Sequence, residues 1–308
     1  MLFALILDYR WFSRYAFLIY TLTFFGLVYV LANGVVASGS KRWIYIGPIS
    51  IQVSEFAKIA IIIVLAKYFE SEKISGQYAL RDLVVPAILT ATLGGLIVVQ
   101  PDLGTTMMIL FIFLAFIVAI EINRMTLIKL FMSGLAFAPA LWFFLKDYQK
   151  ARVRTLFNPD LDPLGAGYHS IQSKIAIGSG GFWGKGLFAG TQSRLNFLPE
   201  KHTDFIFSVF AEETGFFGVI LLISLFIFII LKGLNIAFRA ADRFGFFLSL
   251  GLIISIAFYI IFNIGMTVGI FPITGIPLPF VSYGGSSLIT NYFAAGLLLN
   301  VEMRRTLH

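Results

Sequence analysis

Long apolar runs alternate with short polar segments along most of this 308-residue chain. A membrane-spanning helix needs about 20 consecutive, mainly apolar residues. The runs that approach or exceed this length cover residues 15–33, 54–69, 83–100, 104–120, 126–145, 206–232, 244–270 and 285–301. The pattern therefore predicts an all-α polytopic integral membrane protein with about eight transmembrane helices, which form a single membrane domain over residues 1–308.

Two parts of the chain depart from this pattern. Residues 1–7 are apolar but too few to cross a bilayer, and no cleavage site makes them a signal peptide, so we expect a short remnant of a span. Residues 146–205 form a segment far longer than a usual connection. Because apolar and aromatic residues occur throughout it, unlike in disordered segments, we expect an ordered loop with a function.

The composition excludes an ordinary soluble protein. Charged residues make up 13% of the chain, compared with roughly 25% in soluble domains. The absence of Cys excludes disulfides, thiolate metal sites and Cys nucleophiles, and three scattered His residues leave little for a zinc site. The chain contains no P-loop, GxGxxG, HExxH or GxSxG motif, so nucleotide-driven transport and the commonest hydrolase sites have no support.

The positions of Lys and Arg orient the predicted spans, because short cytoplasmic loops are enriched in both. One orientation places twelve of the 23 on the inside: Arg10, Arg14, Lys67, Lys73, Arg81, Arg124, Lys129, Lys232, Arg239, Arg243, Arg304 and Arg305. We therefore expect a cytoplasmic C-terminus, and segment 146–205 outside. The net charge of +7 reflects topology, not nucleic acid binding, and a basic outer loop favours an acidic partner such as a phosphate head group, a pyrophosphate-linked lipid or an acidic polymer.

Asp204 is the clearest candidate for chemistry. It ends the long polar segment and precedes an apolar run, so we expect it at the outer membrane boundary, with Lys201 and His202 close by to support substrate binding. Beside Phe205 and Phe207, a partly desolvated carboxylate can have a raised pKa and act as a general base. Asp204 is equally suited to cap the following helix, and the two roles are compatible.

Glu55 and Lys58 lie three residues apart, so they share a helix face and can pair inside the bundle or in a wet cavity. Such a pair either fixes the helix position or contacts a lipid phosphate. Lys41 and Arg42, next to Trp43, suit a phosphate head group, or they extend towards the interface without a ligand.

Three other segments have open interpretations. Asp102, in the turn Pro101–Gly104, is expected to cap the next helix. Segment 271–287 is too rich in Pro and Gly for regular helix, and its Ser282, Ser286 and Ser287 either bind phosphate or belong to a plain turn. Glu212 and Glu213, followed by Gly215, indicate an interrupted helix.

Five runs in the same order resemble the SEDS proteins (shape, elongation, division and sporulation), from about Asp8 to Arg305: SGSKRWIYIGPISIQVSEFAK, QPDLGT, FNPDLDPLGAGYHSIQSKIAIGSGGFWGKG, LPEKHTDFIFSVFAEE and GIPLPFVSYGGSS. Within the family, the segments GAGYHSIQSKIAIGSGG and GTQS resemble the elongation member more than the division member. The family has ten spans, so the resemblance leads us to expect that this sequence begins inside the part that corresponds to the second.

The resemblance implies a peptidoglycan glycosyltransferase that polymerises lipid II. It implies that Asp204 is the essential aspartate and that Arg42, Glu55 and Lys58 are needed for activity. It implies a class B penicillin-binding protein and the elongation machinery as partners. A divalent cation, Mg²⁺ or Mn²⁺, is a possible cofactor, and the sequence assigns no site to it. The competing interpretations are a lipid II flippase and a non-catalytic scaffold for the transpeptidase.

Overall fold

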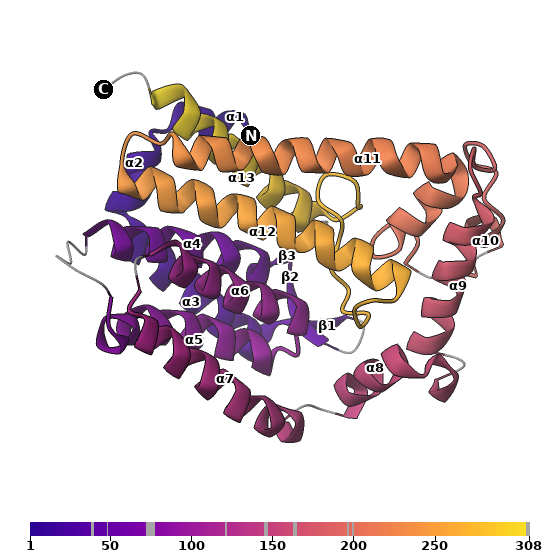
Figure 1. Cartoon of the computed structure of the whole chain (residues 1–308), viewed down its shortest axis with the longest axis horizontal. Coiled ribbons are helices and arrows are strands. Elements are labelled where there is room, and N and C mark those ends of the chain that lie inside the picture. Colours follow the sequence, from indigo (N-terminus) through magenta and orange to yellow (C-terminus); the bar gives the residue numbers. More distant parts are fainter. Residues whose placement is uncertain are drawn as a thin grey trace. The chain divides into compact units, whose positions relative to one another are not determined.

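The computed structural model describes residues 1–37, 40–47, 49–71, 78–120, 122–144, 147–162, 165–195, 197–198 and 200–305. Each of the eight apolar runs forms a helix there (Figure 1): α3 (Ala16–Asn33), α4 (Val53–Ser71), α5 (Val84–Val99), α6 (Leu103–Ala119), α7 (Arg124–Phe144), α11 (Ile206–Phe238), α12 (Arg243–Val268) and α13 (Gly285–Arg304). The prediction of a mainly helical chain is confirmed.

Four of the described segments are long and apolar enough to cross a membrane: Ala16–Asn33, Leu80–Val99, Ile206–Phe238 and Arg243–Val268. Leu80–Val99 joins the short 3-10 helix η1 (Leu80–Leu83) to α5, and α6 is a shorter apolar helix. The expectation of about eight spans is therefore supported directly for four helices. Helix α4 is less apolar because it carries Glu55, Lys58, Lys67 and Glu70.

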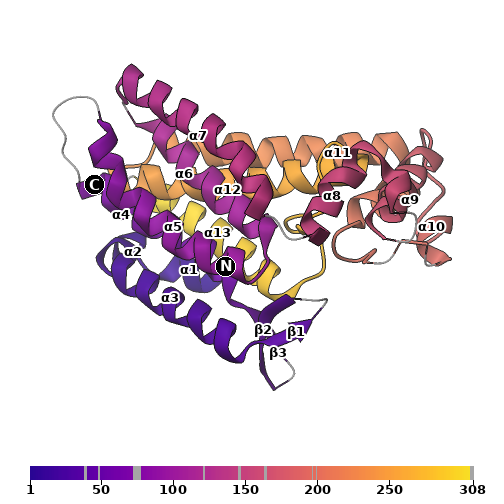
Figure 2. The ribbon, with the colours of Figure 1, turned by 90° about the horizontal axis from the view of Figure 1, so that it is seen from below.

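The all-α prediction is wrong for residues 35–52. This region contains a three-stranded antiparallel sheet of β1 (Val35–Ala37), β2 (Ser40–Ile46) and β3 (Ile49–Gln52), which lies near the end of α3 in Figure 2. Trp43 pairs with Gln52 and Ile44 with Ile51. Aromatic and β-branched residues favour strands, and Gly47 adopts φ +61° between β2 and β3, a backbone conformation that glycine allows at low cost.

The long segment between α7 and α11 is ordered, as predicted, over its described residues. It contains α8 (Asp147–Phe157), the 3-10 helix η2 (Pro159–Leu161), α9 (Ala166–Ser179) and α10 (Thr191–Arg194). Residues 146, 163–164, 196 and 199 of this segment lie outside the described residues, as does Lys73 among the predicted inner cations.

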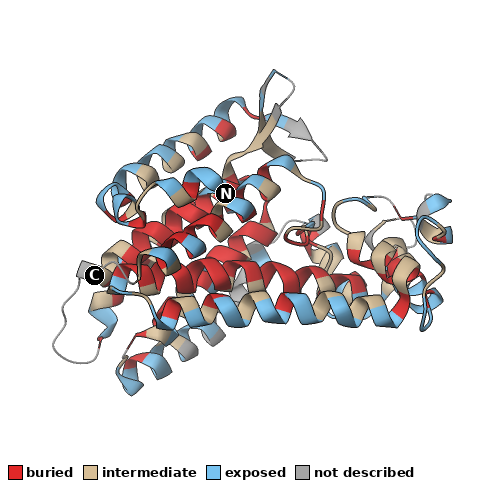
Figure 3. Cartoon of the chain, turned by 90° about the horizontal axis from the view of Figure 1, so that it is seen from above, coloured by how far each residue is buried: buried red, intermediate tan, exposed pale blue. Residues whose placement is uncertain are grey.

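The chain forms two compact units. The first comprises Met1–Asn123, Ile229–Phe258 and Gly284–His308, and the second Arg124–Phe228 and Tyr259–Tyr283. The core of the first unit is centred on α4, whose Ile61, Ile62, Val64 and Leu65 are fully buried, as expected for a helix that is apolar around most of its surface. Figure 3 shows buried positions in red and exposed positions in pale blue along the helices.

In the first unit, α13 holds the N-terminal helices α1 (Leu2–Ile6) and α2 (Tyr9–Arg14). The buried Asn300 side chain binds five partners: Nδ2 donates to Ala4 O, Leu5 O and Leu7 O at 2.8, 3.0 and 2.6 Å, and Oδ1 accepts from Tyr9 N and Arg304 Nε, each at 3.2 Å. Asn300 thus supplies partners to the carbonyl groups that the end of a short helix leaves free.

The Tyr9 side chain adds a second attachment. Its hydroxyl donates to Asp242 Oδ2 at 2.7 Å, while Asp242 Oδ1 accepts from Gly245 N at 2.6 Å in the first turn of α12. Burial and the adjacent Asp242 carboxylate raise the pKa of Tyr9 to about 12, so the hydroxyl remains a donor at neutral pH.

We expect Asn300→Leu to lower the thermal unfolding midpoint of the detergent-solubilised protein. The substitution keeps the branching and the number of side-chain heavy atoms but leaves buried carbonyl groups without partners, at a cost of about 1–3 kcal/mol for each group. Scanning fluorimetry would measure the midpoint, with the exposed Asn235→Leu of α11 as the matched control. Equal midpoints for the two variants would show that Asn300 does not hold the N-terminal helices.

Candidate functional site

The segment that carries Asp204 is held by hydrogen bonds to its backbone. The carbonyl oxygens of three consecutive residues each accept one bond: His202 O from Tyr283 N at 2.9 Å, Thr203 O from Ser282 Oγ at 2.6 Å, and Asp204 O from Asn263 Nδ2 at 3.0 Å. All three donors lie within residues 263–283 of the second unit. The backbone position of Asp204 is therefore set by α12 and the segment that follows it.

Residues 271–284 have the irregular backbone predicted for 271–287 from its Pro and Gly content. The prediction is wrong for the last three residues, Gly285 to Ser287, which form the first turn of α13. Asn263 is fully buried, and its Nδ2 also donates to Ile276 O at 2.7 Å. The Ser282 hydroxyl accepts from Leu278 N at 2.7 Å while it donates to Thr203 O. Two polar side chains thus fix both the irregular segment and the residues next to Asp204.

Gly275 lies directly against the Asp204 side chain. It adopts φ +75°, and a methyl group added there would stand 3.3 Å from Asp204 Oδ2. Both observations favour glycine, since a β-carbon would be strained by the backbone conformation and would crowd the carboxylate. The carboxylate itself is partly buried.

Apolar residues surround the start of α11. Phe205 and Phe207 are buried, and Phe205 packs with Ala176, Leu198 and Ile273. The helix begins at Ile206, so Phe205 occupies the cap position and Asp204 precedes it by one residue. Asp204 therefore lies one residue outside the N-cap position that the sequence analysis considered for it.

His169 of α9 lies beside the same cluster, with its ring centroid 6.3 Å from that of Phe205. Burial lowers the pKa of His169, against a smaller opposing effect of the Asp162 charge, so the imidazole is neutral at pH 7. Its Nδ1 is buried and has no hydrogen-bond partner among the described residues. The sequence analysis did not single out this residue.

Other predicted site residues of the second unit lie near Asp204 in the chain. Lys201 is partly exposed and His202 exposed, so both side chains are accessible for binding. Ser282 is buried, and its hydroxyl binds two backbone groups as described above. The structure thus gives Ser282 a role in holding the segment that carries Asp204.

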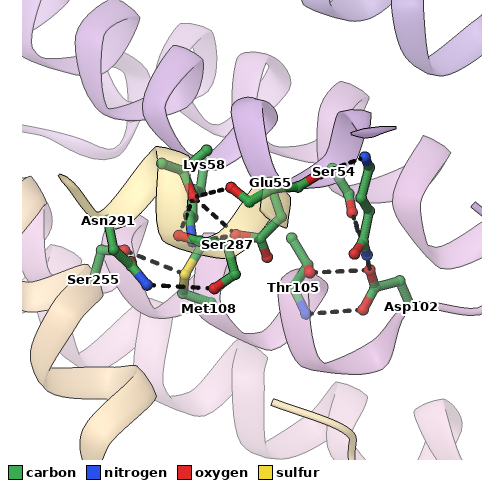
Figure 4. Close-up of polar contacts among 12 residues, drawn as sticks. Ser54, Glu55, Lys58, Asp102, Thr105, Met108, Ser255, Ser287 and Asn291 are labelled. Atoms are coloured by element: carbon green, nitrogen blue, oxygen red, sulfur yellow. Dashed lines mark hydrogen bonds and ion pairs between the residues drawn. The ribbon is translucent and has the colours of Figure 1, made fainter. Parts of the chain in front are cut away.

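In the first unit, the predicted pairing of Glu55 with Lys58 is confirmed (Figure 4). Lys58 Nζ lies 2.6 Å from Glu55 Oε2, and both side chains are at most 5% exposed. Thr290 of α13 donates through Oγ1 to the same carboxylate oxygen at 3.0 Å. The pair therefore ties α4 to α13 inside the helical core.

Asp102 caps α6 as predicted, and it also joins three segments. Oδ1 accepts from Thr105 N at 3.2 Å, and Oδ2 accepts from Thr105 Oγ1, Ser54 Oγ and Gln52 Nε2 at 3.0, 3.1 and 3.1 Å. Figure 4 shows Asp102 reaching both Thr105 and Ser54. A buried carboxylate with several donors of this kind is a rigid structural element.

Arg42 contacts the same turn, a connection that the sequence analysis missed. Its guanidinium donates to Gln100 O at 3.2 Å and to Pro101 O, and Nη1 lies 3.8 Å from Asp102 Oδ1. Lys41 instead donates to Ala32 O at 2.6 Å, near the C-terminus of α3, where a cation is favoured by the helix dipole. Both cations thus have partners within the protein.

Ser286 joins the small sheet to α13. Its hydroxyl accepts from Gln52 N at 3.0 Å and donates to Ser50 O at 3.2 Å. Of the predicted site residues, Lys41, Arg42, Glu55, Lys58 and Ser286 therefore belong to the first unit. Asp204, Lys201, His202 and Ser282 belong to the second.

Helix α11 is interrupted at Gly215, as predicted, with φ +67° and ψ −165°. Glu212, fully buried before the break, accepts five hydrogen bonds on Oε1. The donors are Lys185 Nζ, Thr191 N, Thr191 Oγ1, Gln192 N and Ser179 Oγ, at 2.7, 2.8, 3.0, 3.2 and 3.5 Å. The sequence analysis recognised the break but not this attachment of α11 to residues 185–192.

Among the described residues, no group of three or more His, Cys, Asp and Glu side chains is arranged to hold a metal ion. The expected divalent cation stays a prediction, as do the substrate-binding roles of the residues above.

Comparison with known proteins gives consistent matches. The family model of FtsW, RodA and SpoVE, described as "Cell cycle protein", matches residues 1–307. The peptidoglycan glycosyltransferase MrdB of Escherichia coli K12 is 42% identical over 299 residues, which cover 96% of this chain and 80% of that protein. The stage V sporulation protein E of Bacillus subtilis is 41% identical over 307 residues, covering 98% and 82%.

Solved structures agree with these matches. A chain from a peptidoglycan synthase complex that coordinates polymerization and crosslinking aligns with a TM-score of 0.83 at 31% identity, covering 98% of this chain and 84% of that one. The rod shape determining protein RodA of Thermus thermophilus aligns with a TM-score of 0.72 at 28% identity, covering 99% and 83%. The chain is therefore a multi-pass membrane protein of the SEDS family, the family of FtsW, RodA and SpoVE.

Proposed function

We propose that this protein is a peptidoglycan glycosyltransferase that polymerises lipid II during cell elongation, with Asp204 as general base. The observation that carries the proposal is the placement of Asp204, whose backbone is held by Asn263 and whose carboxylate lies against Gly275. The Escherichia coli relative is named a peptidoglycan glycosyltransferase, and the Thermus relative a rod shape determining protein.

The reaction joins two lipid-linked disaccharide-pentapeptides. Asp204 takes the proton from the 4-hydroxyl of the acceptor sugar while that oxygen attacks the anomeric carbon of the donor. The bond between the anomeric carbon and the pyrophosphate breaks, and undecaprenyl pyrophosphate leaves with the bonding electrons. A positioned base of this kind contributes about 10²–10⁴-fold to the rate.

The developing negative charge on the pyrophosphate requires stabilisation by positive groups. Lys201 and His202, both accessible at their surface, are the proposed direct contacts in the second unit. A divalent cation bound to the pyrophosphate would supply the same stabilisation. Lys41, Arg42, Glu55, Lys58, Ser282 and Ser286 are proposed to support the site through the contacts within the protein described above.

We place the protein in the bacterial cytoplasmic membrane, with its C-terminus in the cytoplasm and segment 146–205 outside. The excess of Lys and Arg in alternate short loops supports this orientation. Lipid II carries its sugars at the outer surface, which is also where a carboxylate between an outer segment and a span is expected.

The proposed partner is a class B penicillin-binding protein, which would crosslink the strands as they form. The support is the similarity to a chain of a complex that coordinates polymerization and crosslinking. Further components of the elongation machinery are expected to bind the same assembly.

The purified protein, reconstituted in vesicles with fluorescent lipid II and its cognate class B penicillin-binding protein, tests this function. We expect glycan strands and one released undecaprenyl pyrophosphate for each bond formed. Transfer of lipid II between leaflets without strands would favour a flippase. A requirement for the protein in transpeptidase binding alone, with neither strands nor transfer, would favour a scaffold. Either result would contradict the proposal.

Ser282→Ala is expected to lower the kcat of polymerisation about 10–100-fold, because a small displacement of a catalytic group has effects of this size. The KM for lipid II should change little, since the hydroxyl binds Leu278 N and Thr203 O. Ser282→Thr keeps the hydroxyl and should retain most activity. If the Ala and Thr variants were equally impaired, the loss would come from packing and not from the hydrogen bonds.

A further inference from the structure

Residues 179–190 are joined to the interrupted part of α11 by backbone hydrogen bonds. Two run from this segment to α11, from Lys185 N to Glu212 O and from Gly186 N to Glu213 O, both at 3.0 Å. Two run the other way, from Phe216 N to Gly181 O at 3.0 Å and from Phe217 N to Phe182 O at 3.3 Å. The break at Gly215 leaves backbone N–H and C=O groups of α11 without partners inside the helix, and the neighbouring segment supplies hydrogen bonds to them.

The close approach requires glycine on both sides. A methyl group at Gly184 would lie 2.1 Å from Glu213 O, and one at Gly215 would lie 2.3 Å from Gly184 N. Both residues also adopt positive φ. Segment 179–190 and the start of the long part of α11 therefore form one rigid piece.

This piece carries a group of exposed apolar side chains, here called the aromatic ledge: Phe182, Trp183, Leu187, Phe188, Phe216 and Phe217. Trp183 is 77% and Phe188 83% exposed. The ring of Phe182 lies 5.6 Å from that of Phe216, and Trp183 6.3 Å from Phe217. Apolar side chains gathered in this way mark a surface that binds a protein or a membrane.

The ledge carries almost no free charge. Lys185 is the one ionisable residue in segment 179–190. Its Nζ lies 2.7 Å from Oε1 of the buried Glu212, so the charge is neutralised by an ion pair. Transfer of segment 179–190 into an apolar layer therefore exposes no uncompensated side-chain charge of its own. The partly exposed Glu213 of α11, whose backbone carbonyl accepts from Gly186 N, has to stay on the polar side of the interface.

The length of α11 places the ledge at one membrane boundary. After Gly215 the helix continues from residue 216 to 238, which at 1.5 Å per residue is about 34 Å. The hydrocarbon core is about 30 Å thick, so this part of the helix is long enough to cross it, with Lys232 in its last two turns extending towards the inner interface. Phe216 and Phe217 then lie where Trp and other aromatic residues are enriched in membrane proteins.

We infer that the aromatic ledge is buried in the interfacial layer of the bilayer and anchors the outer segment to the lipid surface. The ledge continues the exposed face of α11, on which Leu221, Leu225 and Phe228 are also exposed. This helix is long and apolar enough to cross a membrane, so its exposed apolar face is suited to contact with lipid. A protein partner that binds through charges would find none available in segment 179–190. The lipid interface accepts Trp and Phe without requiring matched polar groups.

Spin labelling tests this location directly, because the chain has no Cys. Single variants Leu187→Cys and Trp183→Cys would carry a nitroxide label in vesicles of phosphatidylethanolamine and phosphatidylglycerol. Leu225→Cys, on the exposed face of α11, is the lipid control, and Asp160→Cys, exposed in the same outer segment, is the aqueous control. Collisions with oxygen and with a water-soluble nickel complex report the depth of each label.

We expect the labels at 187 and 183 to prefer oxygen over nickel, at a depth of about 5–10 Å below the phosphates, as for interfacial elements. The label at 160 should prefer nickel. Labels at 187 and 183 that behaved like the one at 160 would overturn the inference. Labels shielded from both reagents would also overturn it, because another protein surface would then cover the ledge. Two label positions guard against a local effect of either substitution.

Discussion

Replacement of Asp204 with Asn is expected to abolish lipid II polymerisation, with a fall in kcat of about 10²–10⁴-fold. Asn has nearly the shape of Asp but cannot accept the proton of the acceptor hydroxyl. The backbone contact from Asn263 to Asp204 O does not involve the side chain, so folding should be retained. Strand formation by purified variants at equal thermal stability measures the effect.

Two controls separate the loss of the base from a general effect of charge removal. Asp160→Asn removes an exposed carboxylate from the same outer segment and should leave the rate unchanged. In the wild type, activity should also fall as the pH drops through the pKa of the base, and the residual activity of the Asn variant should lack this acid limb. Polymerisation by Asp204→Asn at the wild-type rate would exclude Asp204 as the base. If neither the wild type nor the variant formed glycan strands, the proposed enzymatic activity would be contradicted.

The helices could be predicted from the sequence because lipid permits few alternatives. A run of about 20 apolar residues in a bilayer must satisfy its own backbone groups, and an α-helix does so within one segment. Contacts between residues close in the sequence could also be predicted. Glu55 and Lys58 are three residues apart, and Asp102 is three residues before the backbone amide that it caps. Gly215 after two adjacent acids marked the break in α11.

Contacts between distant segments could not be predicted in the same way. Arg42 binds a turn 58 residues away at Gln100, and Asn263 binds Asp204 across 59 residues. One sequence does not specify which segments meet. The sheet at residues 35–52 was missed because it lies in what the pattern treated as a short connection. Asn263 could have been recognised from the sequence. A single amide side chain within an apolar run costs free energy in the membrane unless it forms hydrogen bonds to another part of the protein.

Lys58→Met should strongly destabilise the protein. Lys58 and Glu55 are almost completely buried and their charged atoms are 2.6 Å apart. Removal of the ammonium leaves the Glu55 carboxylate buried without its counter-charge, and loss of one partner of a buried pair costs about 3–5 kcal/mol. The thermal unfolding midpoint in detergent, compared with the wild type, measures the loss.

The double variant Glu55→Gln with Lys58→Met distinguishes a structural role of this pair from a functional one. With both charges removed, no ion remains buried alone, and Gln can still accept the hydrogen bond from Thr290 Oγ1, so most of the stability should return. If polymerisation returns as well, the pair serves only to hold α4 against α13. We expect stability to recover while activity stays low, because the resemblance to the family implies that Glu55 and Lys58 are needed for activity. A double variant as unstable as Lys58→Met would refute the electrostatic explanation and assign the loss to packing.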